Sequence, residues 1–394
     1  MKTNLCAILV LFALSASPLL AAEWEPFCLT ERMLFPSALI SMATYELPEE
    51  DQDDSVLGDQ TGLMGISIAA PKKDTDVEVT LTCESIMEPS VFKGKLPAGG
   101  KEDVYHVLPK IRYKYDALVA NKQARPINIS IAVKLGGKDG GSTNENVTLR
   151  SINECPFRLL DPDDKNAPGE DLSYLFAGYV NEDHPLVDKI LKEALKLGVV
   201  NAFTGYQSGD PLEVYKQVYA VWHALQKAGI KYSDISTTSG TSKVVLSQHV
   251  RLLDDSLANE QANCVDGSVL FASVLRKIGI EPSLVLVPGH CYLGFVSDRE
   301  SKKLMGLETT LISAKDFKAD NIPEAFAKVV NEKFHKEPSW ASFNNAMAAG
   351  TSDLVANAKK FDTEEEPAYR LIHISEARRM GVLPIGSAVQ KKPK

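Results

Sequence analysis

The sequence predicts an α+β protein with two domains in its 394 residues. In the first half, apolar and polar residues alternate with the two-residue period of half-buried strands, as in 76–83 and 127–134. From about residue 186 onward, apolar residues recur at helical spacing, interrupted by short runs rich in Val and Leu. A polar stretch with Pro and Gly at 160–169 separates the two patterns. We therefore expect an all-β, sandwich-like domain at 23–158, a linker at 159–170 and a mixed α/β domain at 171–394.

The first 22 residues have the pattern of a secretory signal peptide. Lys2 precedes an apolar run at 5–14, and small residues follow as far as Ala22. This run is too short to cross a bilayer, and no later apolar stretch is long enough to do so. We expect cleavage after Ala22 and an exported protein, periplasmic or secreted, without stable membrane insertion.

The charge of the chain argues against several classes of partner. The formal net charge is -9, and the sequence has no basic patch of the kind that binds nucleic acid or anionic membranes. His and Cys residues do not occur at zinc-ligand spacing, and no calcium-binding loop is visible. We expect neither a metal nor a cofactor.

Cysteine usage fits an exported protein with one reactive thiol. Cys6 leaves with the signal peptide, and five cysteines remain: Cys28, Cys83, Cys155, Cys264 and Cys291. An odd number indicates at least one free thiol, and Cys264 is our candidate. One disulfide among Cys28, Cys83 and Cys155 is expected, but the sequence does not choose the pair. Cys291 is expected in the core.

The first domain should consist of short strands joined by turns. Besides 76–83 and 127–134, strands are predicted at 63–70, 104–115 and 147–152, with turns at 97–100 and 136–141. In the second domain, helices are predicted at 186–197, 215–225, 326–334 and 340–349. Asp210 should cap the second of these helices, with Pro211 at its first position.

The stretch 263–310 contains the residues that could take part in a reaction. Asn263 can cap a helix that runs from Cys264 towards Gly279, so the thiol would lie in the first turn. Backbone N–H groups and the helix dipole stabilise a thiolate at that position. Asp266 is interpreted as a first-turn acid without a catalytic role, because its charge would oppose ionisation of the thiol.

Two further side chains complete a possible triad. His290 begins the second of two short strands joined by Pro288-Gly289, and Glu308 ends a third apolar run. A helix packed on such a sheet would bring Cys264 against His290, with Glu308 orienting the far imidazole nitrogen. The side-chain amide of Gln248 is a candidate oxyanion donor; an ordinary surface glutamine is the alternative.

These residues lie in a series of motifs that resembles the transglutaminase-like (papain-like) superfamily, in particular its exported bacterial members. The motifs are Val250-Arg251, Cys264 to Asp266, 270–275, 288–290 and 308–310, and the similarity covers roughly 210–311. It implies a transglutaminase-like fold for the second domain and a Cys264, His290, Glu308 triad. The chain departs from the family at Glu308, where many members have Asp, and at Tyr292, where Trp often stands.

The resemblance implies thiol-dependent acyl transfer on a peptide or carboxamide bond, with a peptide or protein as substrate. The acyl group would pass to water, as in a protease or amidase, or to an amine, as in a transglutaminase. The relatives favour hydrolysis. The alternative is a non-catalytic binding or assembly module built on a transglutaminase-like scaffold, in which Cys264 is inert core, His290 a turn residue and Glu308 a solvated strand end.

Overall fold

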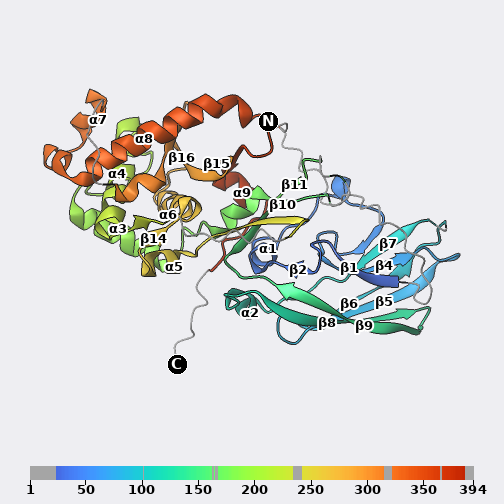
Figure 1. Cartoon of the computed structure of the whole chain (residues 1–394). Coiled ribbons are helices and arrows are strands. Elements are labelled where there is room, and N and C mark those ends of the chain that lie inside the picture. Colours follow the sequence, from blue (N-terminus) through green and yellow to red (C-terminus); the bar gives the residue numbers. More distant parts are fainter. Residues whose placement is uncertain are drawn as a thin grey trace. The chain divides into compact units, whose positions relative to one another are not determined.

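The computed structural model describes residues 24–100, 102–161, 164, 167–233, 242–314, 322–363 and 366–386. The predicted signal peptide lies outside these residues. The chain forms two compact units, Met1–Leu172 with Gly240–Ser247, and Ser173–Ser239 with Gln248–Lys394. Strands dominate the first unit, while the long helices belong to the second (Figure 1), which confirms the α+β class.

The first unit contains a four-stranded and a five-stranded sheet, in the orders β1-β4-β7-β3 and β2-β9-β8-β5-β6. The strands are β1 Trp24–Cys28, β2 Met33–Leu34, β3 Val56–Gly58, β4 Met64–Ala69, β5 Thr75–Thr82, β6 Ser90–Leu96, β7 Val104–Leu108, β8 Arg125–Leu135 and β9 Lys138–Leu149. The predicted alternation is confirmed, since Ile127, Ile129 and Ile131 are buried while the residues between them are exposed. One face of β8 therefore supplies the core, and β5 alternates in the same way, whereas β4 is buried at every residue except Ala69.

The turn between β8 and β9 is tighter than the sequence suggested. Leu135 pairs with Lys138, so only Gly136 and Gly137 connect the strands, with φ angles of 55° and 77°. Two consecutive residues with positive φ are typical of a type I′ hairpin turn. Strand β9 therefore begins at Lys138, inside the stretch that we expected to be loop.

Two short helices make the prediction of an all-β domain wrong in detail. Helix α1 spans Pro36–Ser41 and α2 spans Tyr115–Val119, with a 3-10 turn η1 at Glu49–Asp51. The predicted strand 104–115 accordingly stops at Leu108. Helices of six and five residues are too short to produce a recognisable period in the sequence.

The segment predicted as an interdomain linker lies within the first unit. Strands β10 (Glu154–Leu159) and β11 (Glu170–Asp171) pair antiparallel, with Leu159 opposite Glu170. They form a third sheet, in the order β11-β10-β13, with the distant strand β13 (Val245–His249). The division between the units therefore falls at Leu172, and 240–247 returns to the first unit. This pairing joins residues about 90 positions apart, which local patterns do not reveal.

The expected disulfide is not formed. All five described cysteines are free thiols. Cys28 lies in β1, Cys83 follows β5 and Cys155 lies in β10, so the three candidates lie in or next to three different sheets. Their sulfur atoms contact near neighbours in the chain instead, namely Thr30, Ser85 and Pro156.

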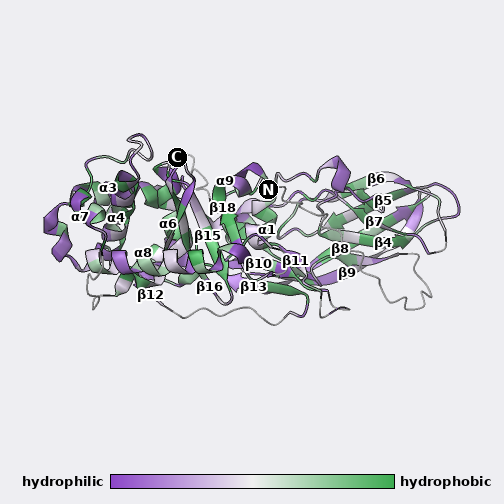
Figure 2. Cartoon of the chain, turned by 90° about the horizontal axis from the view of Figure 1, so that it is seen from above, coloured by the Kyte–Doolittle hydropathy of each residue, from purple (hydrophilic) through white to green (hydrophobic). Residues whose placement is uncertain are grey.

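The second unit has a four-stranded antiparallel sheet, in the order β17-β16-β15-β18, and several helices. Its strands are β15 Pro282–Val287, β16 His290–Asp298, β17 Lys303–Leu307 and β18 Arg370–His373. Strands β12 Lys231–Tyr232 and β14 Gln261–Ala262 form a separate parallel pair. The helices are η2 Ser173–Tyr179, α3 Pro185–Leu197, α4 Pro211–Lys227, α5 Leu253–Ala258, α6 Cys264–Lys277, η3 Thr309–Ser313, α7 Glu324–Val329, η4 Glu332–Lys336, α8 Pro338–Asn357, η5 Ala358–Lys360 and α9 Ile374–Arg379. Figure 2 shows hydrophobic residues along α6 and β15.

The predicted helices are confirmed with one exception. Helix α4 begins as expected, because the Asp210 carboxylate accepts the backbone N–H of Leu212 at 2.9 Å and Pro211 follows the cap. The predicted helix at 326–334 is instead α7 and η4, separated by a break near Val330. Within the described residues, every helix is too short or too polar to cross a bilayer.

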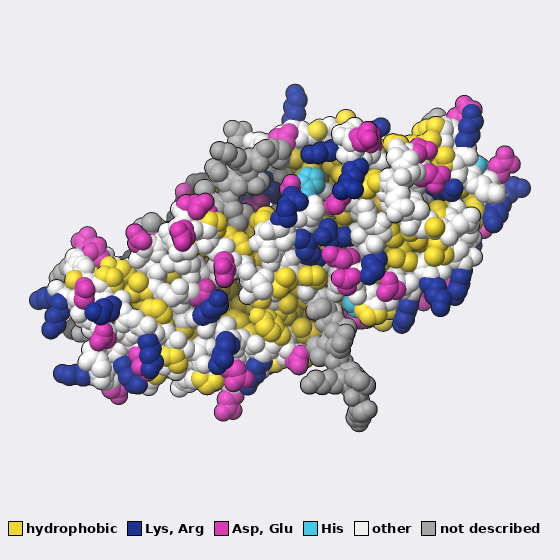
Figure 3. Space-filling view, turned by 180° about the vertical axis from the view of Figure 1, so that it is seen from behind, with side chains coloured by type: hydrophobic (Ala, Val, Ile, Leu, Met, Phe, Trp, Pro, Cys, Tyr) yellow, Lys and Arg dark blue, Asp and Glu magenta, His cyan; other side chains and the backbone are white. Residues whose placement is uncertain are grey.

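Charges of both signs are mixed on one face of the molecule. On the face seen in Figure 3, Lys and Arg side chains are interspersed with Asp and Glu, and no large area carries a single sign.

An aromatic side chain joins three helices of the second unit. Trp222 on α4 is fully buried, with ring centroids 5.5 Å from Phe271 on α6 and 5.9 Å from Phe343 on α8. Its indole N–H donates to the Ser342 hydroxyl at 3.0 Å, so the polar end of the ring is satisfied. Trp222 thereby fixes α6 and α8 relative to α4.

Helix α8 lies directly against the end of strand β17. A Cβ atom on Gly306 would be 2.2 Å from the Gly350 carbonyl oxygen, and one on Gly350 would be 2.6 Å from the Leu307 nitrogen. This approach allows the Glu308 N–H to donate to the Ala346 carbonyl at 3.0 Å. The two facing glycines therefore attach the end of β17 to the helix.

We expect Gly350→Ala to lower the free energy of unfolding. Helix propensity alone would favour alanine by about 1 kcal/mol, but the close backbone contact should reverse the sign and give a loss of about 1–3 kcal/mol. Urea unfolding measures the difference, with exposed Ser352→Ala on the same helix as the matched control. If Gly350→Ala stabilised the protein as Ser352→Ala does, the contact between Gly306 and Gly350 would not be as restrictive as we infer.

Candidate active site

Helix α6 begins with a reciprocal cap that places Cys264 in its first turn. The Asn263 side-chain oxygen accepts the Asp266 N–H at 2.8 Å, and the Asp266 carboxylate accepts the Asn263 N–H at 3.0 Å. This capping box confirms the predicted N-cap. The helix is bounded at its other end by Gly279, whose φ of 78° fits the expected stop. Cys264 is half-buried, so its thiol is not sealed in the core.

A buried ion pair supports the same turn. The Asp266 side chain has no solvent exposure, and its two oxygens accept the Arg251 backbone N–H at 2.7 Å and the Arg251 guanidinium at 2.6 Å. The sequence showed Arg251 and Asp266 only as members of separate motifs. Their contact spans 15 positions and was missed. Because Arg251 balances the Asp266 charge, the carboxylate opposes a thiolate at Cys264 less than an unpaired acid would.

A tight hairpin between β15 and β16 places His290 at the start of β16. Val287 pairs with His290, so Pro288 and Gly289 alone connect β15 to β16, with Gly289 at a φ of 70°. Glu308 immediately follows β17, the neighbour of β16 in the sheet. The Nε2 atom of His290 lies 2.7 Å from Oε2 of Glu308, and the side chains are 33% and 15% exposed. The structure thus brings these two predicted residues together.

His290 also reaches Cys264. Its hydrogen bond to Cys264 and then its hydrogen bond to Glu308 raise the pKa of His290 to about 10, although burial acts in the opposite direction. Since Nε2 faces Glu308, Nδ1 is the nitrogen left for the thiol. For Glu308, burial alone would raise the pKa, but hydrogen bonds from His290 and Thr310 outweigh it and the pKa is lowered. Both shifts favour an imidazolium beside a carboxylate.

Cys291 lies next to His290 in sequence but belongs to the core. Its side chain is buried, as expected, and burial raises the pKa of its thiol well above the ordinary value. A thiol that keeps its proton is a poor nucleophile. Cys264 is therefore the better candidate for chemistry in this strand-and-helix cluster.

Gln248, the candidate oxyanion donor, has its hydrogen-bond partner outside the predicted triad. It belongs to β13, and its side-chain amide donates to the carbonyl of the adjacent His249 at 3.1 Å. No hydrogen bond between described residues joins it to Cys264 or His290. Its role as an oxyanion donor stays a prediction.

Neither a group of metal ligands within the described part of the chain nor a similar protein of known function indicates what this site does. Among the described residues, no three His, Cys, Asp or Glu side chains group so as to hold a metal ion. No family model matches the chain, and comparisons with curated proteins and with solved structures find no match.

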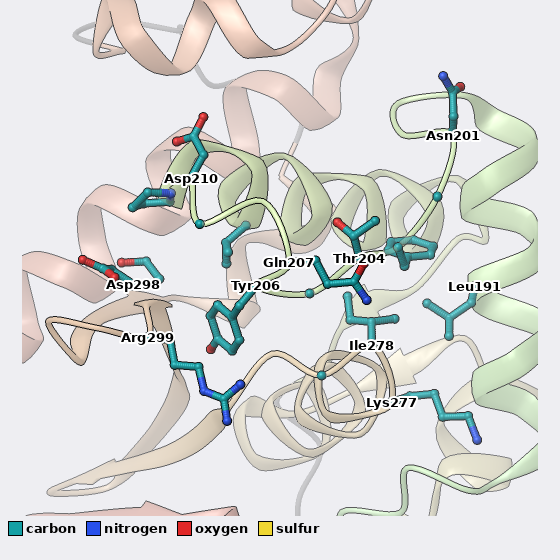
Figure 4. A pocket seen from close by; sticks show the side chains of 18 of the residues that line it. Leu191, Asn201, Thr204, Tyr206, Gln207, Asp210, Lys277, Ile278, Asp298 and Arg299 are labelled. Atoms are coloured by element: carbon teal, nitrogen blue, oxygen red, sulfur yellow. The ribbon is translucent and has the colours of Figure 1, made fainter.

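A separate hollow lies at the opposite end of α6. It has a volume of about 990 Å³ and is bordered by the loop before α4, the end of α6 and the turn after β16, with Tyr206, Ile278 and Arg299 among its lining residues (Figure 4). None of Cys264, His290 and Glu308 lines it. Fourteen helical residues span roughly 20 Å, so this hollow is remote from the thiol.

We expect Arg251→Met to destabilise the second unit strongly. The substitution keeps most of the side-chain length but leaves the buried Asp266 charge without its guanidinium, which should cost about 3–5 kcal/mol of unfolding free energy. Lys196→Met is the matched control, because Lys196 and Glu193 form an exposed pair whose loss should change stability by less than about 0.5 kcal/mol. Equal effects in urea unfolding would contradict the structural role of the pair.

We expect the His290 imidazole to titrate near pH 10 in NMR of the native protein. Its folded pKa is raised above the ordinary 6.5, so its contribution to stability is complete below 6.5 and is lost as the pH rises through about 10. Glu308 has a lowered pKa, so its contribution is complete above 4.5 and is lost on further acidification. Cys264→Ala should lower the His290 midpoint more than Glu308→Gln, because the thiol is the larger cause. A midpoint near 6.5 in the native protein would contradict the hydrogen-bonded arrangement.

Proposed function

We propose that this chain is a thiol-dependent acyl transferase or hydrolase that acts on a peptide or carboxamide bond, and that its second unit is a transglutaminase-like α/β domain. The single observation that carries the proposal is the imidazole of His290, which bonds Glu308 at 2.7 Å and whose raised pKa has Cys264 as its largest cause. Nucleophile, base and orienter are the three parts that covalent acyl transfer needs. The ordered motifs in 250–310 support the same assignment.

In the first step, the Cys264 sulfur attacks the substrate carbonyl carbon. The tetrahedral intermediate collapses to a thioester as the C–N bond breaks, and the His290 imidazolium donates its proton to the departing amine. In the second step, water or an amine attacks the thioester, His290 accepts the proton of that nucleophile, and the Cys264 sulfur leaves as a thiolate when the C–S bond breaks, which restores the starting pair. Glu308 orients the ring and stabilises its positive charge throughout.

The pKa of His290 explains how one residue can serve both steps. The resting pKa of about 10 keeps the ring protonated at neutral pH, as proton donation requires. The largest cause of this raised pKa is the hydrogen bond to Cys264, and acylation converts that sulfur into a thioester, which is a much weaker acceptor. The pKa of His290 must then fall, so the ring loses its proton to the leaving amine and becomes the base for the second step.

We further propose that the chain is exported and that its substrate is a peptide or protein. The apolar run at 5–14, followed by small residues up to Ala22, supports export. Hydrolysis is preferred to amine transfer because the bacterial proteins that the motifs resemble favour it.

Alkylation of the native protein by iodoacetamide tests the proposal, with an internal control in the same chain. Cys28 and Cys264 are both half-buried, but only Cys264 has a helix N-terminus and a histidine partner. At neutral pH Cys264 should react at least about tenfold faster than Cys28, and His290→Ala should remove the difference. Peptide mapping by mass spectrometry identifies the modified residue.

Acyl transfer itself is measured with a labelled casein substrate, with and without a fluorescent primary amine. Release of peptides would indicate hydrolysis, and incorporation of the amine would indicate transfer. Cys264→Ala should abolish either activity, and Glu308→Gln should reduce it. If Cys264 reacts no faster than Cys28 and neither product forms, the non-catalytic module is the correct interpretation.

A further inference from the structure

The two oxygens of the Glu308 carboxylate have different partners. Oε2 faces His290 at 2.7 Å, while Oε1 accepts the Thr310 hydroxyl at 2.6 Å and the Thr310 backbone N–H at 3.1 Å. The short O–H···O distance is typical of a hydrogen bond to an ionised acceptor. One oxygen is therefore held by Thr310, which leaves the other for the imidazole.

The backbone around Glu308 is held on two sides. The Glu308 N–H donates to Ala346 of α8 at 3.0 Å. On the other side, buried Thr309 lies against the first turn of α6, where its hydroxyl is 3.3 Å from that of Ser268 and a Cβ on Gly267 would be 3.0 Å from the same oxygen. With the backbone fixed, the remaining freedom of Glu308 is in its side chain, and Thr310 restricts it.

We propose that Thr310 is a positioning residue for the reaction of Cys264: it fixes the Glu308 carboxylate so that Oε2 is presented to His290. This inference rests on the proposed function for its biological meaning, but not for its geometry. Without the Thr310 hydroxyl, Oε1 keeps one donor instead of two, and the carboxylate can rotate away from the ring. The three consecutive residues then have distinct tasks, since Glu308 orients the imidazole, Thr309 packs on α6 and Thr310 orients Glu308.

Substitutions at the two threonines separate positioning from packing. Thr310→Val removes the hydroxyl at nearly constant volume and should lower the NMR titration midpoint of His290 and slow alkylation of Cys264 by iodoacetamide on the order of tenfold, the size expected for one hydrogen bond to a charged group. Thr310→Ser keeps the hydroxyl and should restore both values. Thr309→Val removes the neighbouring hydroxyl, which does not bond Glu308, and should leave the His290 midpoint unchanged.

A double-mutant cycle tests whether Thr310 acts through Glu308. In a Glu308→Gln background, Thr310→Val should cause little further change in the His290 midpoint, because the charge it orients is gone. An unchanged midpoint in Thr310→Val, or an equal effect with and without Glu308, would overturn the proposal. Thr310→Ala replaces Thr310→Val if unfolding measurements show that valine disrupts the fold.

The titration distinguishes this proposal from the proposed function. If Thr310→Val lowers the His290 midpoint while the native protein shows neither casein cleavage nor amine incorporation, positioning is correct and acyl transfer is wrong. If acyl transfer is present and Thr310→Val changes neither midpoint nor alkylation rate, acyl transfer is correct and positioning by Thr310 is wrong.

Discussion

The hydrogen bond between His290 and Glu308 is the point at which the separate parts of the second unit meet. His290 comes from the start of β16, Glu308 from the end of β17, and Cys264 from the start of α6. Each of these ends has its own support: a two-residue turn before His290, contact with α8 behind Glu308, and a capping box around Cys264. An error of about 1 Å in any of them would separate groups that must touch to react.

Charge is distributed around the thiol so that few acids oppose it. Two carboxylates lie close to the first turn of α6, and each has a cationic partner, Arg251 for Asp266 and His290 for Glu308. The paired Asp266 also completes the helix cap, so its charge has a structural use. With both acids paired, the positive end of the helix dipole is the charge that Cys264 meets at this turn.

The parts of the site that depend on local sequence could be predicted, and the parts that depend on distant contacts could not. The Asn263 cap, the Gly279 stop and the hairpin before His290 each involve residues within four positions of one another. The pairing of Arg251 with Asp266, the contact of Gly306 with Gly350 and the return of β13 to the first unit are long-range contacts. The short helices α1 and α2 were missed for the opposite reason, because they contain too few residues to establish a period.

Exposure and chemistry together select one thiol among five. Cys83, Cys155 and Cys291 are buried, and burial raises the pKa of Cys155 and Cys291, so those two hold their protons and lie away from solvent. Exposure alone would leave Cys28 and Cys264 equivalent. Cys28 ends a β-strand beside a threonine hydroxyl, which provides no positive charge. Cys264 begins a helix and interacts with a histidine whose raised pKa keeps its proton at neutral pH, so among the five thiols it alone combines access with a positively charged partner.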